Sequence, residues 1–154
     1  MSFEIDERHA LRLAYIRVTG PYPEVIGPGF NRLLAWCQKK NIQGDYYALY
    51  WDNPDITPPE ALTTDVAVTV TDDVLGDHEV QIQDMSSGMY ASKTVRIENH
   101  DFEGAWREFF SEIALSEYRY RVPDPCSERY LNDGMADGVW DVELIIPVLP
   151  VDSE

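Results

Sequence analysis

The secondary-structure signals in this sequence occur twice in the same order, and this repetition constrains the fold more than any other feature. The apolar pattern of residues 29–37 recurs at residues 105–113, and residues 65–70 correspond to residues 141–146 with the same offset of 76 positions. A predicted helix, hairpin and strand therefore recur together, which is stronger evidence of duplication than the few identical residues. We expect an α+β protein in which two strand–helix–hairpin units form one antiparallel sheet.

The length of the chain fits a single domain. A chain of 154 residues is about one domain by length, and it is long enough to bury a substantial core. We predict one domain over residues 1–154, with internal repeats at about residues 1–77 and 78–154.

Two segments have the spacing of amphipathic helices. The first starts at Pro28, a residue type favoured in the first helical turn, and ends at the lysines before Gly44. The second begins near Asp101, a favourable N-cap, and must end before Pro123. The first pattern predicts a helix of about three to four turns, and the second predicts a helix with an aromatic-rich apolar face.

Eight segments are predicted to be β-strands. They are rich in β-branched and aromatic residues, and turn-forming residues separate them. The segments are FEID (3–6), LRLAYIRVTG (11–20), YYALYW (46–51), DVAVTVT (65–71), EVQIQD (79–84), GMYASKTVRI (88–97), SERYLN (127–132) and WDVELIIPVL (140–149). Residues 71–79 are expected to connect the two repeats.

Acidic residues dominate the charge of the chain. There are 28 acidic and 12 basic residues, which gives a formal net charge of -16 that is spread along the whole sequence. Such a field repels phosphate backbones, so we expect no direct binding to nucleic acid. It could attract cations or the basic groove of a DNA-handling protein, but a plain soluble acidic surface is the favoured explanation.

Signals for export, membrane insertion and metal binding are missing from the sequence. The N-terminus lacks the apolar segment of a signal peptide, and no apolar run is long enough to cross a bilayer. Cys37 and Cys126 fit no metal or redox spacing, and the three histidines form no HxxxH or HExxH pattern. Residues 85–89 do not form the elbow of a serine hydrolase. We expect a cytoplasmic protein with no cofactor and no membrane partner, and the oligomeric state stays open.

Glu143 lies in the middle of the most apolar predicted strand. A buried charge without a partner costs several kcal/mol, so this carboxylate must face water, have a partner or belong to a site. Strand alternation places Asp141, Glu143 and Ile145 on one face, where the glutamate is either solvated or functional. The first repeat has Ala67 at the corresponding position, so the fold does not require a carboxylate there. The apolar neighbours Ile145 and Pro147 favour the functional interpretation.

The chain is also rich in aromatic residues, with nine Tyr, four Trp and five Phe. Most aromatic side chains in proteins belong to the core, and any single one here is expected to do so. A carboxylate in a cleft lined by aromatic rings, however, is a receptor for lipophilic cations, because the rings add cation–π attraction to the charge pair.

Three stretches of the sequence resemble the GyrI-like proteins, which include the bacterial DNA gyrase inhibitory protein and the effector-binding domains of multidrug-responsive transcription regulators. The stretches are YWDNPDITPPE (50–60), FEGAWREFF (102–110) and CSERYLNDGMADGVWDVELIIPVLP (126–150). The resemblance implies duplicated βαββ units in one strongly bent antiparallel sheet with two helices. It also implies a central ligand cleft that takes amphipathic, often cationic, molecules around one buried glutamate.

In this sequence the family glutamate corresponds to Glu143. The residues that the resemblance and the strand pattern together assign to the ligand are Glu143, Tyr50, Trp51, Tyr90, Trp106, Phe110, Tyr130 and Ile145. One departure from the family is the Gly-Pro-Gly sequence at 27–29, which is expected to shorten or break the first helix and to change one rim of the cleft.

Three functions follow from this resemblance. The first is a free-standing module that binds lipophilic cationic compounds such as drugs or dyes, alone or with a transcription regulator as partner. The second is a protein inhibitor of DNA gyrase, and the third is a hydrolase of cyclopropane-bearing toxins. For the first function, Glu143 of the empty protein is expected to be stabilised by water or a tyrosine hydroxyl and to have a raised pKa.

Overall fold

The structure of the chain, a computed structural model, consists of two compact units. The first unit contains residues 10–86, and the second unit contains residues 1–9 together with residues 87–154. The structure describes residues 3–132, 134 and 138–152. Each unit combines a helix with an antiparallel sheet, which confirms the α+β class predicted from the sequence.

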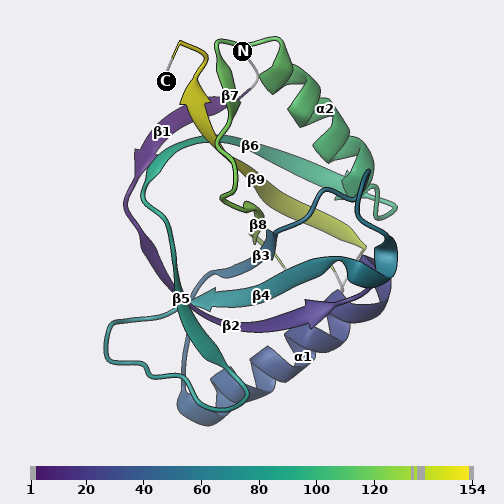
Figure 1. Cartoon of the computed structure of the whole chain (residues 1–154). Coiled ribbons are helices and arrows are strands. Elements are labelled where there is room, and N and C mark those ends of the chain that lie inside the picture. The colour runs from purple at the N-terminus through teal and green to yellow at the C-terminus, as the bar shows by residue number, and fades with distance from the viewer. Residues whose placement is uncertain (1–2, 133, 135–137, 153–154) are drawn as a thin grey trace. The chain divides into compact units, whose positions relative to one another are not determined.

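In the first unit one helix covers one face of a sheet. Its elements are β2 (Leu11–Thr19), α1 (Tyr22–Lys40), β3 (Tyr46–Tyr50), the short 3₁₀ helix η1 (Pro59–Ala61), β4 (Thr63–Thr69) and β5 (Gln81–Met85). The strands lie in the order β3-β4-β2-β5. Helix α1 lies along β2 and β4 (Figure 1), where Leu33 and Trp36 join Ile16, Val66 and Val68 in one buried cluster.

The second unit repeats this arrangement. Its elements are β1 (Glu4–Arg8), β6 (Gly88–Glu98), α2 (Phe102–Ala114), β7 (Tyr118–Tyr120), β8 (Cys126–Tyr130) and β9 (Val139–Pro150). The strands lie in the order β1-β6-β9-β8, and β7 pairs with the end of β9. Phe109 and Ile113 of α2 are buried with Val142, Leu144 and Ile146 of β9, so these three residues form the helix-covered face of the sheet.

Each unit takes its edge strand from the other half of the sequence. Strand β1 at the N-terminus pairs with β6, whereas β5 pairs with β2. The predicted repeats meet at residues 77 and 78, whereas the compact units are residues 10–86 and residues 1–9 with 87–154. The repeats and the units therefore differ in their boundaries. This pairing brings the first residues of the chain onto the sheet that contains Glu143.

The two predicted helices are present, but α1 differs from its prediction. Helix α2 begins after Asp101, whose Oδ1 accepts a hydrogen bond from the Gly104 backbone N–H at 3.0 Å, as expected of an N-cap. Helix α1 begins at Tyr22, because Pro23 and not Pro28 occupies the first turn. It continues through Pro28, so the prediction that residues 27–29 shorten or break this helix is wrong.

Packing explains one of the two glycines in this stretch. A Cβ atom on Gly29 would lie 3.1 Å from Val18 Cγ1 and 3.2 Å from Val66 Cγ2, so glycine lets α1 approach the sheet closely.

All eight predicted strands are present. The structure also contains the strand β7, which was not predicted because three residues are too few to show an alternating pattern. No helix in the described parts of the chain combines the length and the apolar composition that a membrane span requires.

Candidate functional site

Glu143 lies on the sheet face that α2 does not cover. Its neighbours Val142 and Leu144 belong to the helix-covered core, and strand alternation turns Glu143 to the opposite face. On the adjacent strand β8, Arg129 is directly opposite Glu143, so their side chains share this face. The side chain of Glu143 is 12% exposed.

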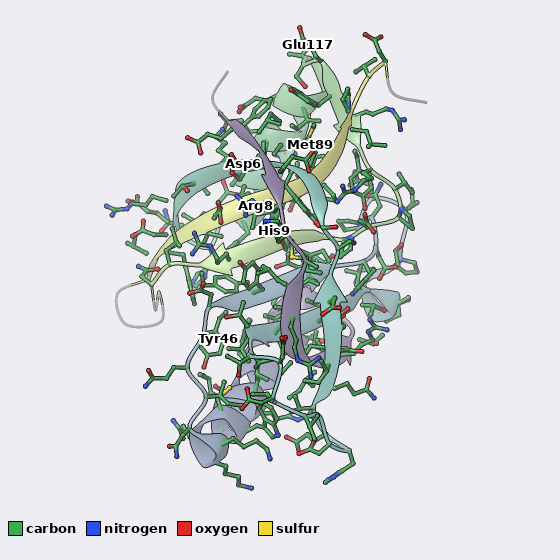
Figure 2. The ribbon with its side chains drawn as sticks, turned by 90° about the vertical axis from the view of Figure 1, so that its left-hand side faces the viewer. Asp6, Arg8, His9, Tyr46, Met89 and Glu117 are labelled. Carbon is green, nitrogen blue, oxygen red and sulfur yellow. The ribbon has the colours of Figure 1, made fainter. Side chains whose placement is uncertain are left out.

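Two arginines bind the carboxylate of Glu143. Arg8 Nη2 donates a hydrogen bond to Oε2 at 3.0 Å, and Arg129 Nε donates one to Oε1 at 2.8 Å. Arg8 is the last residue of β1 (Figure 2). Strand β6 lies between β1 and β9, so Arg8 contacts Glu143 from a strand that does not pair with β9. Each carboxylate oxygen thus has a charged donor, the arrangement that makes burial of a charge tolerable.

The two arginines also determine the ionisation of Glu143. Burial raises the pKa of this carboxyl group, whereas hydrogen bonds and charge attraction from Arg8 and Arg129 lower it, and the net pKa lies below the ordinary value. The expectation of a raised pKa, with water or a tyrosine hydroxyl as partner, is therefore wrong. The sequence could not reveal this, since Arg8 is 135 positions away and the opposition of Arg129 depends on strand register.

Two of the other predicted residues share the face of Glu143. Ile145 follows it by two positions on β9, and Tyr90 of β6 belongs to the same face because Thr94 is opposite Glu143. Both are buried. The guanidinium carbon of Arg121 lies 4.9 Å from the centre of the Tyr90 ring, so this ring already contacts an internal cation.

Trp106, Phe110 and Tyr130 lie on the helix side of the sheet and surround a different carboxylate. Trp106 Nε1 donates to Glu128 Oε2 at 2.6 Å, and the Tyr130 hydroxyl donates to Glu128 Oε1 at 2.7 Å. The ring of Phe110 lies 5.7 Å from that of Trp106. The structure therefore does not bring these three aromatic residues to Glu143.

Sequence reasoning missed Glu128, although its side chain is the more deeply buried of the two, with 1% of its surface exposed. It lies opposite Leu144 on β9, and this register turns it toward α2. The pattern of alternating residues in β8 is compatible with either face, so the sequence contains no clear signal for its burial.

Tyr50 and Trp51 belong to the first unit. The Tyr50 ring packs against Tyr22 with ring centres 5.2 Å apart. Trp51 Nε1 donates to Asp65 Oδ2 at 2.8 Å, and the guanidinium carbon of Arg17 lies 5.5 Å from the centre of the Trp51 ring. Trp51 thus contacts a half-exposed arginine of the protein itself.

Arg17 forms an ion pair with Asp65, a fully buried residue that sequence reasoning also missed. Arg17 binds it with two hydrogen bonds, from Nε to Oδ1 at 2.7 Å and from Nη2 to Oδ2 at 2.9 Å. The second unit contains a similar pair, because Asp65 corresponds to Asp141, which pairs with Arg96 at 3.0 Å.

Groups of metal ligands and surface hollows are other features that could form a site. Within the described residues, no group of histidine, cysteine and acidic side chains could hold a metal ion. Among the hollows on the described surface, one is lined by residues 116–118 and 150–152, and another lies between α1 and residues 77–79. Neither hollow is lined by a residue that the sequence assigned to the ligand.

Comparison with known proteins identifies the family. A family model described as the GyrI-like small molecule binding domain matches residues 1–149. The chain belongs to the GyrI-like family. Proteins named DNA gyrase inhibitor match this GyrI-like chain over nearly their whole length. That of Edwardsiella piscicida is 42% identical and aligns over 96% of the chain and 98% of the relative. That of Yersinia enterocolitica is 39% identical, over 94% and 95%.

Solved structures share the fold at low sequence identity. The C-terminal domain of EcmrR has a TM-score of 0.75 at 12% identity, covering 97% of this chain and 98% of that domain. SAV2435, solved with bound tetraphenylphosphonium, has a TM-score of 0.62 at 13% identity, covering 97% and 94%. A hydrolase from Listeria innocua has a TM-score of 0.71 at 11% identity, covering 96% and 92%.

Proposed function

We propose that this GyrI-like protein binds lipophilic cationic small molecules, with Glu143 as the anionic group that holds the cation. The observation that carries the proposal is the position of Glu143 as a charged side chain on the sheet face left uncovered by α2. The description of the family as small-molecule-binding supports it. A further support is the fold shared with SAV2435, which was solved with a lipophilic cation.

The chemistry of Glu143 suits binding better than catalysis. A carboxyl group with a lowered pKa is ionised at neutral pH, as an anchor for a cation must be. A general acid or base works best with a pKa near the operating pH, and a glutamate reaches that range only when its pKa is raised. Hydrolysis by Glu143 is therefore not part of the proposal.

Calorimetric titration with tetraphenylphosphonium tests the proposal. Glu143→Gln keeps the shape and removes the charge, and it leaves Arg8 and Arg129 without their anion. We expect affinity for the cation to fall on the order of tenfold or more, since opposite charges a few ångströms apart interact by several kcal/mol at a protein surface. Neutral triphenylphosphine oxide has similar aromatic groups, and its affinity should change little.

Asp141→Asn is the matched control for this titration. Asp141 lies on the same face of β9 and pairs with Arg96, so its substitution removes an equal charge without touching Glu143. It should change the affinity for tetraphenylphosphonium much less than Glu143→Gln does. Equal losses for the cation and the neutral compound would show that Glu143 is structural and would reject the assignment.

Inhibition of DNA gyrase is the second candidate function. The specific observation that favours it is the full-length match to several proteins named DNA gyrase inhibitor, one of them 42% identical. An acidic protein of net charge -16 also suits a basic surface of an enzyme that handles DNA. Loss of supercoiling activity at stoichiometric amounts of the purified protein would support this function. Full supercoiling activity at a large excess of the protein would reject it.

A further inference from the structure

Glu143 already holds two cations that belong to the protein itself. Arg8 and Arg129 each donate to one of its oxygens, so a third cation can bind Glu143 closely only by taking the place of one arginine. We propose that Arg8 is a built-in competitor that sets the selectivity of this site, and that a cationic ligand displaces it from Glu143 toward Asp6. The inference rests on the proposed function.

Arg8 is the arginine that the geometry allows to move. Arg129 lies directly opposite Glu143 in the paired strands β8 and β9, which hold its side chain beside the carboxylate. Arg8 is the terminal residue of the edge strand β1 and contacts Glu143 through one nitrogen at the end of its side chain. Its displacement breaks one hydrogen bond and leaves the strand pairing intact.

Asp6 provides a second acceptor for the displaced guanidinium. It precedes Arg8 by two positions, so both side chains lie on the same face of β1 (Figure 2). Arg8 Nη2 is 3.0 Å from Glu143 Oε2 and 3.7 Å from Asp6 Oδ2. The same nitrogen therefore lies between two carboxylates, and a small rotation of the side chain transfers it from one to the other.

The charges around Glu143 favour this exchange. Glu143 and Asp6 together balance the charges of Arg8 and Arg129, but both arginines contact Glu143. If Arg8 moves to Asp6, one oxygen of Glu143 is free for the cationic ligand, and the displaced guanidinium keeps an anionic partner. A cation can bind only the fraction of the protein in which Arg8 has left Glu143. The apparent affinity for every cation is therefore the intrinsic affinity multiplied by that fraction. Neutral compounds do not compete with it, so Arg8 acts on cations alone.

Titration of Arg8 variants with tetraphenylphosphonium at low salt tests the inference. Arg8→Gln should raise the affinity about three- to tenfold, because the competing charge is gone. Arg8→Lys keeps the charge and should bind much as the unmodified protein does. Arg96→Gln is the matched control, since it removes an arginine that pairs with Asp141 on the same face, and it should raise the affinity far less.

Asp6→Asn tests the same exchange in the opposite direction. Without the second acceptor Arg8 remains on Glu143, so the affinity for tetraphenylphosphonium should fall. Glu4→Gln removes an equal charge from the same face of β1 and should have a smaller effect. This variant keeps the inference testable even if Arg8→Gln does not fold.

The outcomes separate the two proposals. If Glu143→Gln weakens binding of the cation but Arg8→Gln strengthens it no more than Arg96→Gln does, the role of Arg8 is rejected and the proposed function stands. If the unmodified protein and Arg8→Gln both fail to bind the cation, the proposed function is rejected. Binding that appears only in Arg8→Gln would support both.

Discussion

Glu143 can remain charged in an apolar strand because two arginines supply the hydrogen bonds that water would otherwise make. Arg8 and Arg129 contact different oxygens of the carboxylate, at 3.0 and 2.8 Å. Charge-assisted hydrogen bonds of this kind are stronger than neutral ones, and they offset part of the desolvation cost. The side chain thus has both a structural partner and an ionised state suited to a ligand.

The first prediction concerns stability and pH. At pH 7, Glu143→Gln should lower the free energy of unfolding by about 1 to 3 kcal/mol, because the hydrogen bonds of two charged donors weaken. The folded pKa of Glu143 lies below its ordinary value of 4.5, so its ionised form stabilises the folded state above that pH. The contribution disappears as the pH falls through the lower, folded pKa.

Urea unfolding of both proteins across a pH series is the measurement. The difference between them should be constant above about pH 5 and should shrink at more acidic pH, because other acidic groups affect both proteins equally. A difference that is the same at pH 7 and in strong acid would contradict the ion pairing of Glu143.

The second prediction concerns the buried Glu128. Tyr130→Phe removes the hydroxyl that donates to Glu128 Oε1 at 2.7 Å, and a buried acceptor that loses its donor costs about 1 to 3 kcal/mol. Tyr118→Phe is the control, because Tyr118 is a half-buried tyrosine of the same unit whose hydroxyl has no recorded hydrogen bond within the described residues. Equal stabilities of the two variants would show that the Tyr130 hydroxyl does not stabilise Glu128.

At the scale of elements, α1 packs closely on its sheet at Gly29, where a Cβ atom would make tight contacts. A Cβ on Gly29 would meet Val18 and Val66 at 3.1 and 3.2 Å, whereas a Cβ on Gly27 would meet nothing within 4 Å. The two glycines are two positions apart in the same helix. Gly29 faces the sheet, whereas Gly27 faces away from it.

The third prediction compares these glycines. Gly27→Ala should stabilise the protein by about 0.5 to 1 kcal/mol, because alanine restricts the unfolded chain and favours a helix. Gly29→Ala should destabilise it by up to about 2 kcal/mol, since overpacking outweighs the gain in helix propensity. Thermal unfolding of both variants decides the matter, and stabilisation by both would contradict the close packing of α1.

The elements were largely predictable because their signals are local. The aromatic spacing of α2 and its Asp101 cap identified that helix, and eight strands were recognised from their composition and boundaries. The start of α1 was predicted wrongly, because the prediction placed Pro28 in the first turn, whereas Pro23 occupies the first turn and the helix continues through Pro28. The exchange of β1 and β5 depends on long-range pairing that no local pattern contains.

At the scale of the whole molecule, the net charge of -16 governs which partners can approach. The fourth prediction is that the purified protein does not bind duplex DNA at physiological salt, because 28 acidic residues against 12 basic ones repel the phosphates. A mobility-shift assay at micromolar protein should show no complex. A shifted band that disappears as the salt concentration rises would contradict the charge argument.

The candidate site was predictable in part. Glu143 and its face followed from strand alternation and from the family resemblance. The division of the aromatic residues was not predictable, because the register of β8 against β9 decides that Tyr130 and Glu128 turn toward α2 while Arg129 turns toward Glu143. A shift of that register by one residue would reverse all three directions.

The most direct test of Glu143 as the ligand anchor is a crystal structure of the protein with bound tetraphenylarsonium. Arsenic scatters anomalously and locates the centre of the cation independently of the protein atoms. We predict one arsenic peak beside the Glu143 carboxylate, on the sheet face shared with Tyr90 and Ile145, with Arg8 moved toward Asp6. An arsenic peak elsewhere on the protein, with Arg8 still bound to Glu143, would contradict the account.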